Sequence, residues 1–237
     1  MSNDYFQFKQ FTIHQDRCAM KVSTEACILG AWFANLDIRP KTILDIGSGT
    51  GLLMLMLAQK WPGTFHGIEI DPDAAGQLNE NIDASPRKEK CIAYQGDIRN
   101  YTLPIQYDFI ITNPPFYENQ LNSKNRSINL ARHSSELSLE ELLTSIQSHL
   151  NPTGSFGIIL PTNRAIYFAK MASENQFYLK QKLDIRHSDL HGDFRTILHM
   201  GRKESPQVLT STLIIRDEAG NYSREFTHLM KDYYLYL

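Results

Sequence analysis

The sequence has few cysteines, no long apolar run and almost no net charge. Its three cysteines, Cys18, Cys27 and Cys91, are odd in number and far apart, which argues against disulfides and cysteine-bound zinc. None of the eight histidines has metal-ligand spacing beside a carboxylate cluster, so no metal is expected. No stretch reaches the roughly 18 to 20 apolar residues of a membrane span, and the first residues lack the apolar core of a signal peptide. These absences predict a cytoplasmic protein that enters no membrane.

The charge balance excludes a generally basic molecule. With 24 Lys and Arg against 26 Asp and Glu, any contact with nucleic acid must come from local patches. Positive charge is in excess in residues 118–133 and 180–203, although ordinary solvated surface is an equally good interpretation of each patch alone. The sequence also lacks internal repeats, low-complexity tracts and linker-like stretches, so one domain spanning 1–237 is expected. A monomer is the simplest expectation.

What the sequence does contain is an alternation of strand and helix patterns. Strands are predicted at 42–46, 65–70, 91–95, 107–112 and 155–160. Helices are predicted between them, at 51–60, from Pro72, from Ser138 and at 163–175, with a turn at 151–154. Such alternation predicts right-handed βαβ crossovers and therefore a doubly wound, mostly parallel α/β sheet. The β-rich stretches that follow predict an antiparallel β-hairpin end with extra C-terminal strands, at 177–186, 195–201 and 208–215.

A glycine-rich turn separates the first predicted strand from the first predicted helix. It reads Asp45-Ile46-Gly47-Ser48-Gly49-Thr50-Gly51. Glycines at this place let the backbone turn tightly and approach a ligand. The third glycine comes one position earlier than in the usual dinucleotide fingerprint, so NAD binding is disfavoured.

Acidic residues follow the next two strands. Glu69 can accept hydrogen bonds from both hydroxyls of a ribose, with Asp71 as a close alternative. Asp97, in Gly96-Asp97-Ile98, can accept one from the amino group of an adenine. Either carboxylate alone would more often be a solvated strand end or a helix cap. Their order and spacing favour a nucleoside that lies across the carboxyl edge of the sheet.

Together DIGSGTG, GIEID and GDI resemble the successive motifs of the class I S-adenosylmethionine-dependent methyltransferases. The resemblance implies a Rossmann-like, seven-stranded sheet with S-adenosyl-L-methionine as the cofactor. It also implies a set of cofactor-binding residues, which run from the methionine end to the adenine end: Asp45, Gly47, Gly49, Gly51, Glu69, Asp97 and Ile98.

A second motif, Asn113-Pro114-Pro115-Phe116, directly follows the fourth predicted strand. That strand neighbours the first one in a doubly wound sheet, so Asn113 is expected to reach the same crevice and to contact the cofactor, although Asn-Pro-Pro is also a common structural turn. An exocyclic nitrogen is a poor nucleophile because its lone pair is delocalised. The side-chain oxygen of Asn113 and the carbonyl of Pro114 can accept both of its N–H bonds and aim the lone pair at the methyl group.

Two aromatic residues end this motif. Phe116 or Tyr117 would stack on a planar substrate, and either ring could instead belong to the core. NPPF resembles the (N/D/S)PP(Y/F/W) motif of amino methyltransferases that act on adenine N6, guanine N2 or glutamine amide nitrogen. The resemblance implies catalytic roles for Asn113, Pro114, Pro115, Phe116 and Tyr117.

Both ends of the chain narrow the substrate. The chain resembles the bacterial tRNA adenine-N6 methyltransferases that modify adenosine 37 of a valine tRNA. The resemblance lies in residues 8–11, 14–22, 29–32 and 131–134 and in the closing YSREFTHLMKDYYLYL. The similarity covers nearly the whole chain, although this chain has MKVSTEA where that family usually has MKVGTDG. It implies that residues 1–38 pack over the cofactor site, with Lys21 and Thr24 as candidate contacts, on a catalytic core of 39–237. An N-terminal flap with packing roles only is the alternative.

The physics of such a target agrees with these motifs. Adenosine 37 adjoins the anticodon in a single-stranded loop, where a base can be splayed out without opening a duplex. Basic side chains would then bind phosphates on either side of the pocket. The candidates are Lys124, Arg126, Arg132, His133 and Arg195, the last of which could equally form a surface salt bridge.

Three other functions remain open on the sequence. A guanine-N2 methyltransferase of ribosomal RNA shares NPPF, and a protein glutamine N5-methyltransferase has a related motif. The third is an RNA-binding scaffold of methyltransferase fold without turnover. A scaffold has no physical need for both DIGSGTG and NPPF, which argues against that function.

Overall fold

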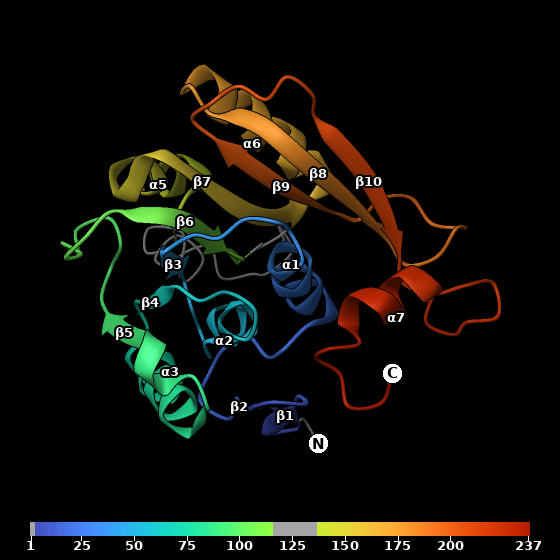
Figure 1. Cartoon of the computed structure of the whole chain (residues 1–237), viewed down its shortest axis with the longest axis horizontal. Helices are drawn as coiled ribbons and strands as arrows, with labels where there is room; N and C mark the ends of the chain where they lie inside the picture. The colour runs from blue at the N-terminus through green and yellow to red at the C-terminus, as the bar shows by residue number, and fades with distance from the viewer. Residues whose placement is uncertain (1–2, 116–136) are drawn as a thin grey trace, which may run out of the picture.

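The computed structural model describes residues 3–115 and 137–237, and its centre is an eight-stranded sheet (Figure 1). The strand order is β10-β8-β9-β7-β6-β3-β4-β5. Five neighbouring strands are parallel: β3 (Thr42–Ile46), β4 (Thr64–Glu69), β5 (Cys91–Gln95), β6 (Tyr107–Thr112) and β7 (Leu150–Pro161). The predicted doubly wound, mostly parallel sheet is therefore confirmed.

The predicted antiparallel end is also confirmed. Here β8 (Tyr178–Arg186) and β9 (Arg195–Gly201) pair antiparallel, and β9 pairs antiparallel with β7. These two strands complete a seven-stranded arrangement, and β10 (Leu209–Ile214) adds an eighth strand parallel to β8. The extra C-terminal strand thus continues the same sheet.

Helices cover both faces of the sheet because successive strand residues point to opposite sides. On β3, Ile43 and Leu44 are both fully buried but belong to different apolar clusters. The first cluster takes in α1 (Thr24–Ala34), α2 (Leu52–Ala58), α3 (Pro72–Ala84) and α7 (Arg224–Met230). The second takes in α5 (Leu139–His149) and α6 (Thr162–Glu174).

The helix ends follow the signals in the sequence. The Asp71 side chain accepts a hydrogen bond from the Ala74 amide, with Pro72 at the first helical position of α3. Ser138 and Glu141 form the predicted capping box of α5. All seven residues of α2 are buried, as its uniformly apolar sequence predicts.

The predicted turn at 151–154 is wrong, because these residues lie inside β7. Leu150 already pairs with Tyr107, and Ser155 pairs with Phe109, so four residues bulge where the partner strand has one. Turn-forming residues therefore interrupt the pairing of this strand without ending it.

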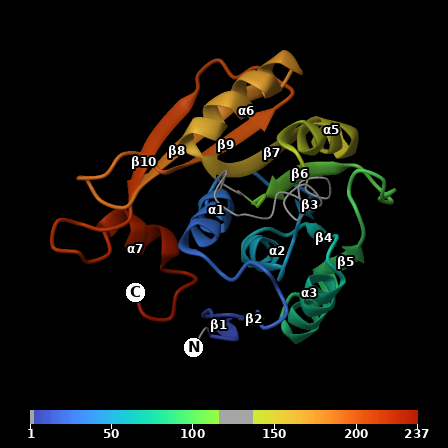
Figure 2. The same ribbon diagram turned by 180° about the vertical axis from the view of Figure 1, so that it is seen from behind.

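A small N-terminal sheet, which the sequence did not predict, consists of β1 (Tyr5–Gln7) and β2 (Thr12–His14). It lies beside α3 and the C-terminal end of the chain, as Figures 1 and 2 show. Phe8 forms an antiparallel bridge with Tyr234, and the Lys9 amide donates to the Tyr233 carbonyl over 2.8 Å. The N-terminal segment is thus held from two sides.

The strand registers bring the ends of most strands to one edge of the sheet. Ile46 at the end of β3 is opposite Thr112 at the end of β6, and Pro161 at the end of β7 is opposite Arg195 at the start of β9. Arg186 at the end of β8 is opposite Ile214 at the end of β10. The segments that follow β3, β4, β5, β6, β7, β8 and β10 therefore share this carboxyl edge.

Candidate functional site

The loop after β3 has the backbone conformation that its glycines predict. Gly47, Gly49 and Gly51 have φ angles of +69°, +52° and +83°, which side chains rarely adopt. A Cβ atom on Gly51 would lie 2.6 Å from Leu78 Cδ1, whereas one on Gly47 or Gly49 would meet no atom within 4 Å. The loop therefore packs on α3 at one glycine and has open space beside the other two.

Hydrogen bonds fix this loop to the end of β4. The amides of Gly47 and Ser48 donate to the Ile68 carbonyl over 2.9 and 3.1 Å. The Ser48 hydroxyl donates to the Asp45 carbonyl over 2.8 Å, and the Gly49 amide donates to Glu69 Oε2 over 2.8 Å. The loop is thus formed by the fold itself.

Asp45 is a buried carboxylate beneath this loop. It is 1% exposed, and neither of its side-chain oxygens has a hydrogen-bond partner among the described residues. Burial raises the pKa of Asp45 to about 7, against a smaller opposing effect of the nearby Met54 backbone amide. A buried acceptor without a partner fits a cationic ligand group, such as the ammonium of S-adenosylmethionine.

Glu69 is buried at the end of β4 and already orders the backbone around it. Its Oε1 accepts from the Asp71 amide over 3.0 Å, while Oε2 holds the Gly49 amide. A carboxylate offers about four lone-pair positions, so both oxygens keep capacity for ribose hydroxyls. Asp71, the alternative acceptor, instead caps α3.

Asp97 follows β5 and is paired with a guanidinium. Arg99 Nη2 lies 2.6 Å from Asp97 Oδ2, and Arg99 Nη1 lies 3.2 Å from Glu141 Oε1. The hydrogen bonds from Arg99 lower the pKa of Asp97, so its carboxylate is ionised, and both of its oxygens already accept from Arg99. Ile98 beside it is buried in the second apolar cluster.

The Asn-Pro-Pro segment leaves β6 next to the glycine loop. Thr112 donates its hydroxyl to the Ile46 carbonyl over 2.9 Å, which ties the two strand ends together. Pro114 is buried, Pro115 is exposed, and Asn113 is half-buried. Asn113 Nδ2 lies 3.9 Å from the Met20 sulfur, a weak acceptor, and its side-chain oxygen accepts no hydrogen bond from residues 3–115 or 137–237. Phe116 and Tyr117 lie outside the described residues.

The contacts of Lys21 and Thr24 are with other parts of the chain. Lys21 Nζ donates to the Asn3 carbonyl over 3.0 Å and lies 3.8 Å from Asp4. Thr24, the first residue of α1, lines a hollow with Phe194 and Tyr222. Cofactor contacts by Lys21 and Thr24 stay a prediction.

Two buried amides on α3 bind the N-terminal segment, and one of them, Asn81, also binds the glycine loop. Asn81 Nδ2 donates to the carbonyls of His14 and Thr50, each over 2.9 Å, and Asn81 Oδ1 accepts from the His14 amide over 2.9 Å. Gln77 Oε1 accepts from the Arg17 amide over 3.1 Å. Neither residue is predicted from the sequence, although polar side chains beside Leu78 and Ile82 on the buried face of a helix are a signal for them.

Of the five candidate RNA contacts, one can be placed. Arg195 opens β9 at the carboxyl edge, and its Nη1 donates to the Phe194 carbonyl over 3.2 Å. Lys124, Arg126, Arg132 and His133 lie outside the described residues.

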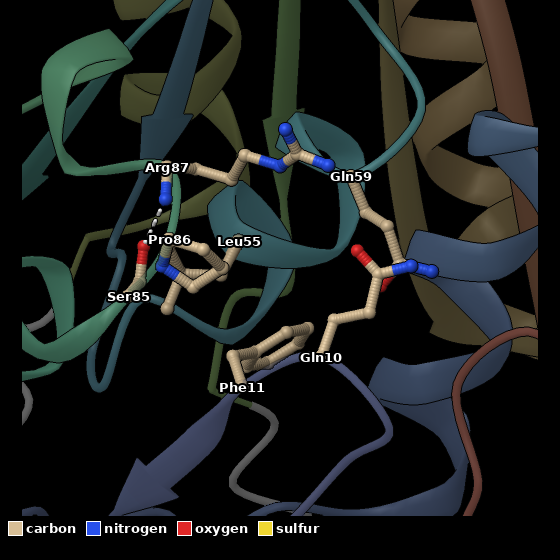
Figure 3. Close-up of a pocket in the computed structure, with 7 residues that line it drawn as sticks. All are labelled: Gln10, Phe11, Leu55, Gln59, Ser85, Pro86 and Arg87. Atoms are coloured by element: carbon tan, nitrogen blue, oxygen red, sulfur yellow. Dashed lines mark hydrogen bonds between the residues drawn. The ribbon is translucent and has the colours of Figure 1, made fainter.

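A shallow hollow elsewhere does not belong to this site (Figure 3). It lies beside α2 and the end of α3, and it has no volume that a water-sized sphere can enter. Its lining residues are Gln10, Phe11, Leu55, Gln59, Ser85, Pro86 and Arg87.

The sheet and its carboxyl edge define a class of protein. A glycine loop follows the first strand of the parallel sheet, acidic residues lie at the ends of the second and third strands, and Asn-Pro-Pro follows the fourth strand. This is the arrangement of a class I S-adenosylmethionine-dependent methyltransferase. Residues 29–176 match the family model of the methyltransferase small domain. The described residues contain no helix that could cross a membrane and no group of three or more side chains suited to hold a metal.

Relatives identify the family. The chain belongs to the tRNA1(Val) (adenine(37)-N6)-methyltransferases: a member from Dyadobacter fermentans is 38% identical over 237 residues, covering 98% of both chains. A crystal structure of a predicted O-methyltransferase from Agrobacterium tumefaciens shares the fold, with a TM-score of 0.68 and 13% identity over 87% of this chain and 95% of that one. A glycopeptide N-methyltransferase solved with S-adenosyl-L-methionine also shares it, with a TM-score of 0.56 and 11% identity over 77% and 100%.

Proposed function

We propose that this protein transfers a methyl group from S-adenosylmethionine to N6 of adenosine 37 in tRNA1(Val). One observation carries the proposal: the glycine loop and Asn113 leave adjacent parallel strands at the same edge of the sheet. Donor and acceptor can therefore meet in one crevice. The family of the chain supports adenine N6 as the acceptor and tRNA1(Val) as the substrate.

The chain's own residues would hold the donor from end to end. S-adenosylmethionine supplies a methyl group that is already activated on a positively charged sulfur. Asp45, buried and without a partner among the residues described, would accept from its ammonium. Glu69 would accept from the ribose hydroxyls, and Asp97 from the adenine amino group, while the open sides of Gly47 and Gly49 leave room for the ligand.

Asn113 and Pro114 would prepare the acceptor nitrogen. The lone pair of N6 is delocalised into the ring, and two acceptors that hold both N–H bonds favour a pyramidal nitrogen with its lone pair aimed at the methyl group. Positive charge grows on this nitrogen as the bond forms. The two hydrogen bonds strengthen with that charge, so they stabilise the transition state more than the ground state.

The residues proposed to contact RNA lie both within and outside the described ranges. Phe116 or Tyr117 would stack on the splayed adenine, and Arg195, at the same edge as Asn113, would contact a phosphate. The four basic candidates at 124–133 would serve the other side of the pocket. A protein with this substrate acts in the cytoplasm, where tRNA is available.

Methylation of total bacterial tRNA tests the function. The protein is incubated with radiolabelled S-adenosylmethionine and the RNA, which is then digested to nucleosides. We expect label in N6-methyladenosine, and mapping of tRNA1(Val) should place it at position 37. Label in N2-methylguanosine or in protein would indicate one of the alternative methyltransferases. The absence of label from both RNA and protein would support a scaffold.

A further inference from the structure

A second hollow lies on the same edge of the sheet as Asn113. Its volume is about 170 Å³, well above the ~10 to 15 Å³ that one water needs. Three parts of the chain line it: the start of α1, the loop between β8 and β9, and the turn after β10. Its polar and aromatic lining residues are Thr24, Glu25, His187, Phe194, Arg216 and Tyr222.

Backbone hydrogen bonds hold the walls of this hollow in place. The Ile215 amide donates to the Arg186 carbonyl over 2.9 Å, and the Arg216 amide donates to the His187 carbonyl over 3.0 Å. The Phe194 amide donates to the Ile185 carbonyl over 3.0 Å. In both views α7 lies beside α1 and the end of β10 (Figures 1 and 2).

The lining offers flat surfaces with polar groups around them. The rings of His187 and Phe194 stack at 3.8 Å with an interplanar angle of 12°. The Arg216 guanidinium lies over the Tyr222 ring at 4.6 Å. His187, Arg216 and Tyr222 are exposed, and Glu25 and Thr24 add hydrogen-bonding groups. Stacking surfaces with polar groups at their rim are what recognises an unpaired nucleic-acid base.

The position of the hollow fits a neighbour of the methylated nucleotide. β9, β8 and β10 are the second, third and fourth strands from β6, so strand spacing separates the hollow from Asn113 by about 10 to 19 Å. Nucleotides one to a few positions apart in a single-stranded loop can cover this distance. Arg216 in the hollow and Arg195 at its border supply positive charge for the connecting phosphates.

We propose that this hollow binds one unpaired nucleotide of the anticodon loop while adenosine 37 occupies the catalytic crevice. The base stacks on His187, and Arg216 contacts its phosphate or its edge. The hollow thereby selects RNA whose loop presents a base at the correct distance from the target. This inference rests on the proposed function.

Anticodon stem-loop RNAs of tRNA1(Val), each lacking one loop base, test the proposal. Binding to the full chain is measured for the wild type, His187→Ala and Arg216→Ala, with Arg39→Ala as the control. Arg39 is exposed and precedes β3, at the opposite edge of the sheet. Wild type should lose about tenfold in affinity when one particular base other than 37 is absent. For His187→Ala the intact RNA should bind about tenfold more weakly, and the same abasic RNA should show little further loss.

Cofactor affinity should stay unchanged in His187→Ala and Arg216→Ala, thermal unfolding should show that both variants are folded, and Arg39→Ala should match the wild type throughout. The proposal is overturned if both variants respond to every abasic RNA as the wild type does. Methylation of adenosine 37 without any such base dependence would refute the hollow alone. Base-dependent binding without methylation would refute the proposed function and leave the hollow as an RNA site.

Discussion

The loop after β3 and the segment after β6 begin side by side but are built differently. Gly47, Ser48 and Gly49 are fixed by hydrogen bonds to Ile68 and Glu69. Asn113 has only a weak sulfur contact among the described residues. The fold thus forms the donor side in advance and leaves the acceptor amide available for a substrate. Substitutions on the two sides should therefore damage different steps of the reaction.

The largest effect is expected for Asn113→Ala. Loss of one preorganised acceptor should lower kcat by about 10²- to 10³-fold, with little change in cofactor affinity. Single-turnover methylation and titration calorimetry measure the two quantities. Asn79→Ala is the matched control, because within the described ranges the Asn79 side chain bonds only its own helix, at the Ala75 carbonyl. A loss of cofactor binding as large as the loss of turnover would break the distinction between the two sides.

Gly49→Ala should weaken cofactor binding by the loop after β3. Its φ of +52° costs a side chain about 1 to 2 kcal/mol, and the strain is relieved only if the loop leaves its bound geometry. We expect cofactor affinity to fall about tenfold, with kcat at saturating cofactor less affected. Gly220→Ala is the control: its φ is +81° and its Cβ also meets nothing within 4 Å. Both variants should lose similar thermal stability, and only Gly49→Ala should lose cofactor binding.

Asp45 gives the donor side a dependence on pH. Burial raises its pKa from 3.8 to about 7. Below that pH, Asp45 is therefore mainly protonated in the folded, ligand-free protein. Its contribution to stability is fully present below about pH 4 and is lost as pH rises to about 7. Asp45→Asn should remove this contribution. Thermal unfolding of both proteins between pH 4 and 8 checks the difference, and parallel curves would contradict the assignment.

Binding of the cofactor should favour the ionised form of Asp45. An ammonium beside the carboxylate favours the ionised form, so binding below pH 7 should release a proton and strengthen as pH rises. Titration calorimetry at pH 6 in two buffers of different ionisation enthalpy measures that proton. Asp45→Asn should release none, and an equal release from both proteins would place the titrating group elsewhere.

The smallest effect is expected for Arg195→Ala. If Arg195 contacts a phosphate, the variant should bind RNA a few-fold more weakly, and its salt slope should fall by about one. RNA binding of the wild type should weaken steeply with salt, whereas cofactor binding should change little. A flat salt response of the wild type would refute phosphate contacts by the basic segments.

Much of the fold follows from local sequence patterns. The five parallel strands, the hairpin of β8 and β9 and the capping box of α5 were all predicted, because apolar periodicity and caps act over a few residues. The small N-terminal sheet was not, because β1 and β2 are three residues each and pack on distant residues, as the ring of Phe6 in β1 does on Tyr234. The bulge in β7 was read as a turn because its residues favour turns locally.

In the candidate site, too, the features set by local sequence were predictable and those set by distant contacts were not. The conformations of the glycines at 47–51 were predictable, since positive φ angles are a local demand of the loop. The roles of Gln77 and Asn81 depend on residues about 60 to 67 positions away, and no local pattern encodes such contacts. Lys21 was proposed from a resemblance, and its contact with Asn3 reflects how the N-terminal segment folds back on itself.

The pairing of residues 8 and 9 with residues 233 and 234 has a consequence for synthesis on the ribosome. Chains begin to fold while they emerge, N-terminal parts first. The glycine loop and its neighbouring strands can form early, but β1 and β2 gain their last partners only after residue 234 has left the exit tunnel. A nascent chain would therefore hold its N-terminal segment without these C-terminal partners until the last residues are synthesised.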